Sequence, residues 1–347
     1  MSTAEALRLD APSDHEAFDA FARERGWSDG LPLVPPTSER VAAHLAAAGL
    51  AGAEVIAALP PSGAPVTAEK LAINAVMAGA PAASMPLLGA AVEALADPGF
   101  ELHALNATTG SVVPALLING PVRHELGIPF GAGCLGGADG QAAAIGRALR
   151  LVMRNVAGQR VGITSQSTFG QPGRVAGILF GEWEERSPWA PLAERRGVPG
   201  NAVTVFGAMG TANICDPVAT DPDVLLHFVG RALAHTGANG YLVQLSFAEV
   251  LVALNPVWAE MIGRRYPDVA EVASILWEHA SVPLSEFPGQ HQRQFEDIGW
   301  VDDRGRVKLA RRPEDVLVTV AGGLGGLHAA ALHSWGTTIT QTRPIRS

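Results

Sequence analysis

The cysteines of this chain are few enough to be considered one by one. Among 347 residues there are two, Cys134 and Cys215. Cys134 lies in the glycine-rich stretch 130–139, which precedes a predicted helix over 140–156. A glycine-rich turn that opens a helix presents backbone N–H groups and the positive end of the helix dipole, and both lower the pKa of a thiol. We therefore predict that Cys134 is a nucleophile, with a small buried cysteine in a tight turn as the alternative.

Two more glycine-rich turns follow predicted strands, at 207–216 and 321–328, and Asn119-Gly120 ends a further strand. In open α/β sheets the ligand binds where strands end, so turns gathered at one sheet edge would bring backbone donors to a common site. The alternative is that these glycines are present because helices pack closely on the sheet there. If the site is shared, these turns contribute Asn213 and Cys215 to substrate binding and His328 to catalysis.

A polar island interrupts the apolar sequence between residues 102 and 110. It contains an imidazole, an amide and two hydroxyls, from His103, Asn106, Thr108 and Thr109. Buried polar groups need hydrogen-bond partners, so the island is either a satisfied network in the core or a cluster that orients substrate. The functional interpretation makes His103 catalytic and gives the other three residues a role in binding.

Four charged residues complete the candidate site. Glu182 is next to Trp183, and a carboxyl group against an aromatic wall can have a raised pKa and act as a general acid or base. Asp29 lies in a loop held by prolines, and Lys70 opens an otherwise uncharged helix. Arg174 can clamp a carboxylate or phosphate. The alternatives are a solvated acidic loop and an exposed lysine at a helix start.

Composition excludes several classes of function. The chain has 25 Lys and Arg against 34 Asp and Glu, a net charge of −9, which argues against nucleic acid as a partner. Two cysteines exclude cysteine-rich metal modules, and the histidines lack zinc-site spacing, so we predict no metal site and see no cofactor motif. The charge-free runs 71–92 and 316–341 are broken by proline or glycine, which predicts buried structure and no membrane contact. Without a secretion signal, we expect a cytoplasmic protein.

The order of predicted elements indicates an α/β or α+β fold with a layered, mainly buried sheet and flanking helices. Residues 27–37 are predicted to be extended, followed by helices that Thr37 and Thr67 cap and that Gly49 and Gly79 end. A third helix covers residues 85–95. Further strands are predicted at 114–120, 161–164, 175–180, 202–207, 241–245 and 315–322, and further helices at 139–156, 222–236 and 247–265. Residues 1–100 are expected to pack on a core formed by 101–347.

A weak internal repeat indicates that the core is duplicated. Three pairs of segments match at nearly constant offsets: Phe180-Gly-Glu182 with Phe247-Ala-Glu249, Ser187-Pro188 with Asn255-Pro256, and Arg195-Arg196 with Arg264-Arg265. A fourth pair, Gly146-Arg-Ala-Leu149 with Gly230-Arg-Ala-Leu233, has a larger offset and requires an insertion. A duplication predicts two similar lobes, about 101–200 and 201–347, around a pseudo-twofold axis with the site between them. Alanine-rich sequence produces such matches by chance, which is the alternative.

Four motifs together resemble a poorly characterised bacterial family associated with UGSC-type selenoproteins and their cysteine forms. They are residues 27–37, 67–79, 102–110 and 320–323. Members of the family carry a cysteine where this chain has Ala80, and Pro-Gly-Lys-His where it has 171–174 and 325–328. The resemblance implies a thiol or selenol protein partner.

These observations predict a soluble enzyme that acts on a small anionic metabolite. Thiol or acid–base catalysis of a lyase, hydrolase or cyclisation type fits the available residues. The alternative function is a substrate-binding or accessory subunit of a thiol- or selenol-dependent reductase complex. In either case we expect a homo-oligomer.

Overall fold

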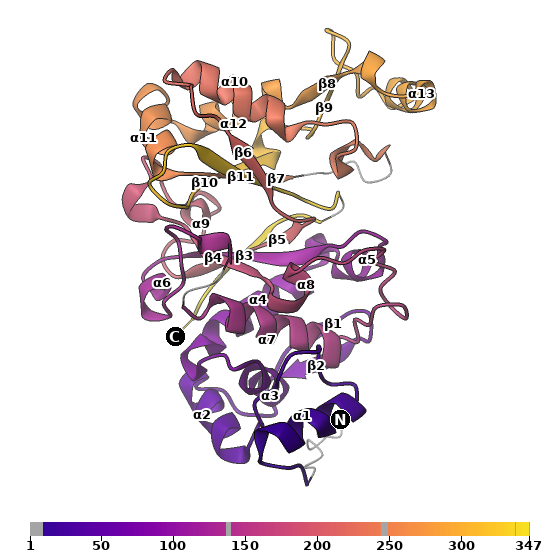
Figure 1. The fold of residues 1–347 in the computed structure, drawn as a ribbon, viewed down its shortest axis with the longest axis vertical. Helices are drawn as coiled ribbons and strands as arrows, with labels where there is room; N and C mark the ends of the chain where they lie inside the picture. Colours follow the sequence, from indigo (N-terminus) through magenta and orange to yellow (C-terminus); the bar gives the residue numbers. More distant parts are fainter. Residues whose placement is uncertain (1–9, 137–139, 244–248, 337, 347) are drawn as a thin grey trace.

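The computed structural model describes residues 10–136, 140–243, 249–336 and 338–346. Two four-stranded sheets lie face to face between two layers of helices (Figure 1). The fold is therefore of the α/β or α+β class, as the alternation of apolar runs predicts.

The four N-terminal helices are α1 (His15–Glu24), α2 (Ser38–Ala48), α3 (Ala68–Ala78) and α4 (Met85–Ala96). Two of the four, α2 and α3, begin and end where capping residues predict. The Thr37 and Thr67 hydroxyls accept hydrogen bonds from the first turns of α2 and α3, and Gly49 and Gly79 end these helices in the left-handed conformation. The caps confirm the predicted bounds because they satisfy backbone groups that the helix itself leaves unpaired.

The first sheet has the strand order β12-β5-β3-β4. Its strands are β3 (Val113–Asn119), β4 (Ile178–Gly181), β5 (Ala202–Ala208) and β12 (Gln341–Pro344). β3 runs parallel to β4 and antiparallel to β5, and β12 is antiparallel to β5.

The second sheet has the order β10-β7-β11-β6. Its strands are β6 (Ala212–Cys215), β7 (Val250–Leu254), β10 (Val316–Val320) and β11 (His328–His333). β7 runs parallel to β10 and antiparallel to β11, and β6 is antiparallel to β11. The two sheets therefore have the same strand directions and the same order.

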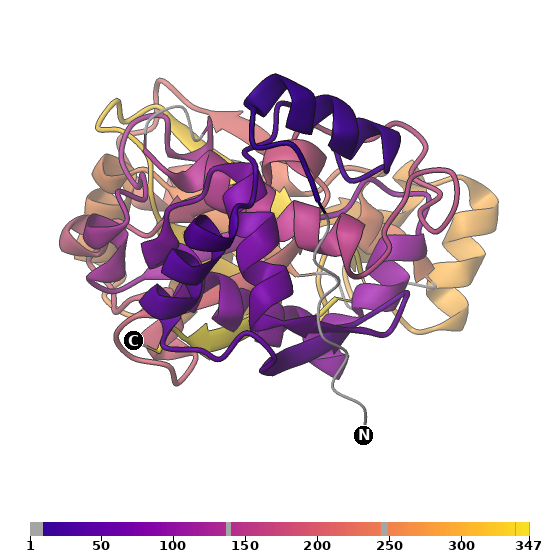
Figure 2. The same ribbon diagram turned by 90° about the horizontal axis from the view of Figure 1, so that it is seen from below.

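Side-chain alternation divides the sheets between three apolar cores. In β3, Leu116 and Ile118 pack under α3, α4 and α7 (Ala142–Asn155), while Ala115 and Leu117 face the second sheet. In the second sheet, the face that points away from the first sheet packs under α10 (Pro222–Leu233), α11 (Pro256–Arg265) and α12 (Val269–His279). Figure 2 shows the N-terminal helices in front of the rest of the molecule when it is seen from below. Because strands buried on both faces have no polar side, they appear in the sequence as continuous apolar runs.

The chain crosses from one sheet to the other twice. β5 of the first sheet leads directly into β6 of the second, and β11 of the second leads into β12 of the first, visible in Figure 1 as the descending yellow segment. At the crossing, Met209 N donates to His333 O at 2.9 Å and Trp335 N donates to Gly207 O at 3.0 Å. This symmetric pair of bonds lies on a pseudo-twofold axis. Because both crossings exchange an edge strand, no single cut near residue 200 separates the two sheets.

The segments that suggested a duplication are not the equivalent ones. Topology makes Asn255, directly after β7, the counterpart of Asn119, the last residue of β3, and not of Ser187. Residues 244–248, which include Phe247, lie outside the described residues. The topology is two-fold, but the sequence matches that led us to expect it were in the wrong register.

Several predicted elements are wrong in type. Residues 161–164 form a turn between two isolated bridge positions, because Gly162 adopts a positive φ of 78° there. The predicted strand 241–245 begins in the 3-10 turn Asn239–Tyr241, and its end lies outside the described residues. The predicted helix 247–265 contains β7 before α11, and the strands β11 and β12, which follow β10, were not predicted.

The remaining helices and strands are short or peripheral. They are α5 (Leu102–Ala107), α6 (Val122–Glu125), α8 (Gly173–Ala176), α9 (Leu192–Arg195) and α13 (Gly289–Asp297), and the hairpins β1 (Val55–Leu59) with β2 (Ala64–Thr67) and β8 (Ser281–Pro283) with β9 (Arg306–Lys308). Among the described residues, no helix has the length and apolar character that crossing a membrane requires. The charge-free runs 71–92 and 316–341 are helices and strands joined by turns, as predicted.

Candidate functional site

A cavity of about 300 Å³ opens between the two sheets, beyond the ends of β7 and β10 and the start of β11. The lining residues whose side chains can react with or bind a substrate are Cys134, Asn213, Asn255 and His328. The glycine-rich turn 321–327 forms much of the cavity wall. Three of these four side chains were predicted site residues, and they come from segments far apart in the chain. The fold therefore gathers them at one place.

Strand register explains why these side chains face the cavity. Ile214 and Ala329 pack among the helices that cover the second sheet. Because successive residues of a strand point to opposite faces, Asn213, Cys215 and His328 point toward the first sheet. Cys215 lies directly opposite His328 in the β6–β11 pairing, and both residues are exposed. Both cysteines of the chain therefore lie near the mouth of the cavity.

Asn255 holds the strand that carries the imidazole, and sequence analysis did not select it as a site residue. Its Oδ1 caps α11 by accepting from Trp258 N at 2.9 Å, and its Nδ2 donates to the backbone oxygen of His328 at 2.6 Å. The available signal was an asparagine followed by proline at the end of an apolar strand, which is a helix start. Asn255 thus fixes the backbone of His328 from within the cavity wall.

Cys134 is held by the contact between two glycine-rich segments. It begins the 3-10 turn Cys134–Gly136, and Gly322 N donates to Phe130 O at 2.9 Å in the same loop. A Cβ atom on Gly323 would lie 3.2 Å from the Cβ of Ala132, so glycine allows the two segments to approach this closely. The thiol consequently lies against the turn that follows β10.

The expected lowering of the Cys134 pKa is wrong. Burial raises the pKa of this thiol, and backbone hydrogen bonds from Gly322 and Leu135 only partly oppose the increase. Cys134 is 5% exposed, and α7 does not start until Ala142, so the thiol is not in the first turn of that helix. Desolvation of the thiolate therefore outweighs the donors around it.

The described residues that line the cavity include no lysine or arginine. Lys70 lies on α3, where its Nζ donates to Pro65 O at 2.8 Å, and Arg174 lies on α8 with Ser165 as its partner. Within the described parts of the chain, no three His, Cys, Asp or Glu side chains gather closely enough to hold a metal ion. Ligand contacts in the cavity must therefore come from backbone N–H groups, side-chain amides, the thiol and the imidazole.

The polar island does not reach the cavity. It precedes β3, whose first residue Val113 pairs with Ala208 at the crossing. His103 is exposed on α5, and Asn106 is buried, with its Nδ2 donating to Pro60 O at 3.0 Å. The other two members serve local turns: Thr108 Oγ1 accepts from Gly110 N, and Thr109 O accepts from Thr168 N. The glycine turn at 207–210 lies at this same end, so the glycine turns do not share one sheet edge.

Glu182 and Asp29 belong to buried networks outside the cavity. Glu182 Oε2 accepts from Asn119 Nδ2 at 2.8 Å and from Leu192 N at 2.7 Å, and burial raises the pKa of its carboxyl group. Asp29 makes a bidentate pair with Arg147, at 2.7 and 2.8 Å. In this structure both carboxylates hold segments of the chain together.

The two sheets differ at equivalent positions. Asn119 ends β3 at the position equivalent to Asn255 after β7, but the space beyond β3 and β4 is filled by a network of charged side chains. There Arg123, only 2% exposed, pairs with Glu184 at 3.0 Å. Beyond β7 and β10 glycine replaces these large side chains, and the cavity occupies the space.

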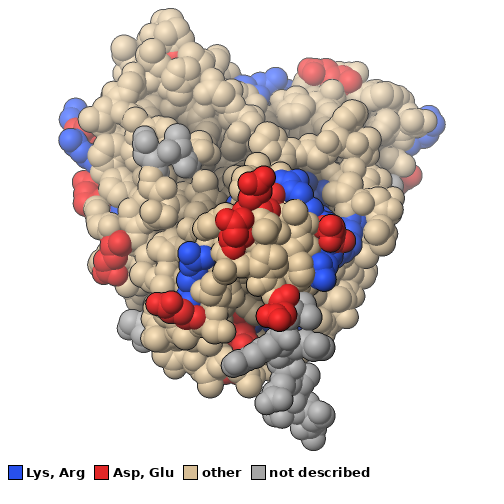
Figure 3. All heavy atoms as spheres, turned by 60° about the horizontal axis from the view of Figure 1, so that its bottom comes forward, with Lys and Arg blue, Asp and Glu red and all other residues tan. Residues whose placement is uncertain are grey.

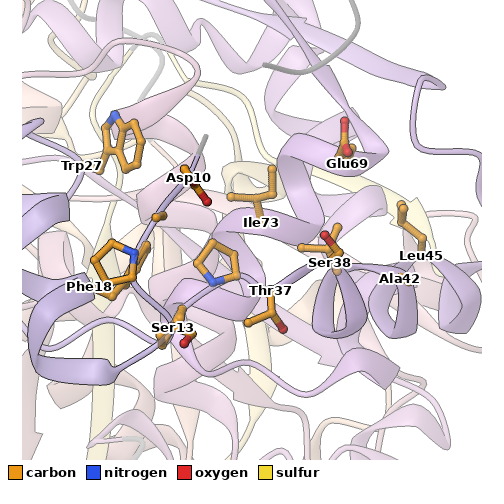
Figure 4. Close-up of a pocket in the computed structure, with 15 residues that line it drawn as sticks. Asp10, Ser13, Phe18, Trp27, Thr37, Ser38, Ala42, Leu45, Glu69 and Ile73 are labelled. Carbon is orange, nitrogen blue, oxygen red and sulfur yellow. The ribbon is translucent and has the colours of Figure 1, made fainter. Parts of the chain in front are cut away.

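A larger groove of about 560 Å³ lies among the N-terminal helices. Figure 4 shows Phe18 and Trp27 on one side, Leu45 and Glu69 on the other, and Ile73 between them. Among the residues that the structure describes, its lining offers no thiol, imidazole or basic side chain. Figure 3 shows the surface around these helices as mostly uncharged, with acidic and basic side chains interspersed. We therefore place the candidate site in the smaller cavity, where reactive groups converge.

Comparison with protein families, with curated proteins and with solved structures finds no match to this chain. The resemblance to the UGSC-associated family therefore stays a prediction.

Proposed function

We propose that the protein is an enzyme of small-molecule metabolism whose reaction takes place in the cavity between the sheets. Cys134 is the nucleophile and His328 is its general base. The observation that carries the proposal is the convergence of a thiol, an imidazole and two amides on one cavity at the strand ends. The sequence predicts both Cys134 and His328 as catalytic residues.

Because the pKa of Cys134 is raised, a neighbouring base must remove its proton before it can react. Because burial raises its pKa, the thiol keeps its proton at neutral pH, so nucleophilic attack requires a base. Among the described residues that line the cavity, His328 carries the side chain that can accept a proton from the thiol. In the proposed step His328 takes the Sγ proton and sulfur bonds to an electrophilic carbon. As the bond to the leaving group breaks, the imidazole returns the proton to that group.

The cavity also limits the substrate. A volume of about 300 Å³ is at the small end of ligand sites, so the substrate is a small metabolite. N–H groups of the glycine-rich turn and the amides of Asn213 and Asn255 suit a carbonyl or carboxylate oxygen. With no lysine or arginine among the described lining residues, an anionic group would depend on these donors and on the imidazole of His328.

The test is untargeted metabolite profiling with the purified chain. We expect the wild-type protein to consume a small carbonyl- or carboxylate-bearing metabolite, and Cys134→Ser and His328→Gln to consume none. Cys215→Ser, which removes the other thiol, is the matched control and should keep turnover. Full turnover by folded Cys134→Ser protein would overturn the proposal.

A specific observation favours a second candidate function, an accessory subunit that holds substrate for a thiol or selenol protein. Cys215 is exposed and lies opposite His328, so a partner could reach the second thiol at the cavity mouth. In that case consumption appears only after a protein fraction from the source cells is added, and Cys215→Ser abolishes it. Consumption by the purified chain alone argues against this candidate.

A further inference from the structure

Two arginines lie side by side beneath the segment that joins α7 to α8. Arg150 on α7 is 9% exposed, and its Nε donates to the backbone oxygen of Arg174 at 3.0 Å. The two helices can approach because Gly146 and Gly177 meet there, where a Cβ on Gly177 would lie 2.8 Å from the Cα of Gly146. This contact brings Arg174, on the last turn before β4, next to Arg150.

No carboxylate balances these charges among the described residues. Neither arginine takes part in an ion pair, whereas Arg147 on the same helix pairs with Asp29. Burial and the charge of Arg174 lower the pKa of Arg150 to about 9, and burial lowers the pKa of Arg174. A buried cation without a counter-ion is unfavourable, so proteins normally pair it.

Two buried donors beside the arginines have no partner. Arg174 uses both Nη atoms on Ser165 Oγ at 3.2 Å, but its Nε is buried and unpaired. Gln159 accepts from Arg150 Nη2 through Oε1 at 2.5 Å, and its Nε2 is likewise buried and unpaired. Unpaired donors beside uncompensated positive charge are what an anion would satisfy.

The connecting segment 156–172 buries polar side chains and exposes large apolar ones. It buries Ser165 completely and leaves Gln159 5% exposed, while Phe169 is 95% exposed and Ile163 is 72% exposed. The hydrophobic effect favours burying the apolar side chains and exposing the polar ones, so this arrangement is unfavourable in free energy. Long connections without helix or strand are commonly functional. Inside the protein, Gln159 accepts a hydrogen bond from Arg150, and Ser165 accepts from Arg174.

We propose that Arg150 and Arg174, with Gln159 and Ser165, form a binding site for a phosphate dianion under the segment 156–172. Two guanidinium groups match the charge of a dianion, and their planar donors match its oxygens. The dianion is either inorganic phosphate or the phosphate group of a metabolite. The site is separate from the cavity that holds Cys134 and does not depend on the function proposed there.

Thermal unfolding tests this site. Sodium phosphate, sodium sulfate and glycerol phosphate are each compared with sodium chloride at equal ionic strength. A ligand of the folded state raises Tm by mass action, so we expect phosphate to raise the wild-type Tm by at least about 3 °C at saturation. A larger rise with glycerol phosphate than with phosphate identifies a phosphorylated metabolite as the ligand. Equal rises identify the free ion.

Variants complete the test. Arg174→Gln should lose the phosphate effect, and Arg174→Lys, which keeps the charge but not the planar fork, should retain a smaller one. Arg264→Gln, at an exposed ion pair on α11, is the control and should keep the full rise. If Arg174→Gln does not fold, the wild-type and Arg174→Lys proteins are titrated with phosphate in a calorimeter, and the heat of binding shows whether the site takes phosphate. A phosphate effect no larger than that of chloride, or equal in wild type and Arg174→Gln, overturns the proposal, as does calorimetry without heat of binding.

Discussion

Burial raises the pKa of both Cys134 and Glu182, yet the two side chains have different surroundings. The thiol faces a cavity, where a substrate can displace water and a base can take the proton. The carboxyl group is enclosed by partners that the fold supplies, Asn119 and the backbone of Leu192. A perturbed pKa indicates a functional residue only when the group can be reached.

The reactivity of Cys134 follows from its desolvation. In Cys215→Ser protein, where Cys134 is the remaining cysteine, iodoacetamide should modify the thiol more slowly at pH 7 than it does after unfolding in urea. The reason is that the raised pKa leaves less thiolate in the folded protein. Mass spectrometry of the alkylated protein over a range of pH measures the rate. Faster alkylation in the folded state would contradict the raised pKa.

Glu182 should matter for stability and not for turnover. Glu182→Ala removes the acceptor for Asn119 and Leu192 N in the interior, so we expect it to lower the free energy of unfolding by about 2–4 kcal/mol. Glu182→Gln keeps one acceptor oxygen and should lose less. Urea unfolding measures both values. If folded Glu182→Gln protein loses its turnover, Glu182 has a catalytic role that its position does not explain.

At the scale of elements, ion pairs and caps hold the N-terminal segment on the first sheet. The extended residues 27–37 have no strand partner, and Asp29 attaches them to α7 through Arg147. Burial alone would raise the pKa of Asp29, but the hydrogen bonds and charge of Arg147 outweigh it and leave the pKa below its ordinary value. Both side chains are nearly buried, so water screens the pair weakly.

Asp29→Asn should destabilise the protein in a pH-dependent way. We expect a loss of about 1–3 kcal/mol at pH 7 because the bidentate pair is broken. Since the folded-state pKa lies below the ordinary 3.8, the contribution of Asp29 is present above that pH and is lost as pH falls through the folded-state value. Urea unfolding of both proteins at pH 7 and about pH 3 measures the difference. A difference that grows on acidification would contradict this assignment.

The helices with clear caps and stops could be predicted from the sequence, whereas several strands could not. Thr37 and Gly49 specify α2 by local hydrogen bonding, which needs no knowledge of the rest of the chain. By contrast, β7 is a five-residue apolar run directly before α11, and periodicity cannot separate a short buried strand from a helix. β6 and β12 are short edge strands with few apolar residues, and their partners are distant in sequence.

The site could be predicted only in part for the same reason. Glycine-rich turns pointed to Cys134, Asn213 and His328, because such turns are local features. Which turns share a sheet edge depends on strand pairing. The turn at 207–210 was therefore grouped with the wrong end of the sheets, and Asn255 was not recognised.

At the scale of the whole molecule, the exchanged edge strands make the two sheets one folding unit. The first sheet takes β12 from the C-terminal segment, and the second takes β6 from the segment after β5. The cavity lies between the sheets and takes Cys134 from one half and His328 from the other. The candidate site therefore depends on both crossings.

Cutting the chain tests this dependence. A protease site inserted between Thr236 and Gly237, which are exposed, gives two fragments that each lack one edge strand of their own sheet. We expect the cleaved fragments to stay together in size-exclusion chromatography and to separate only in denaturant. Each fragment expressed alone should fail to fold, because it leaves an open sheet edge and an uncovered face. Two fragments that separate as folded monomers would contradict the exchange.

Turnover of the metabolite found by profiling, compared between variants, tests the central claim most directly. We predict that kcat/KM falls about 100-fold or more in Cys134→Ser and in His328→Gln, while Glu182→Gln stays within about threefold of wild type. Circular dichroism and thermal unfolding confirm that each variant is folded. Wild-type kcat/KM in folded Cys134→Ser and His328→Gln proteins would contradict the assignment of the active site to this cavity.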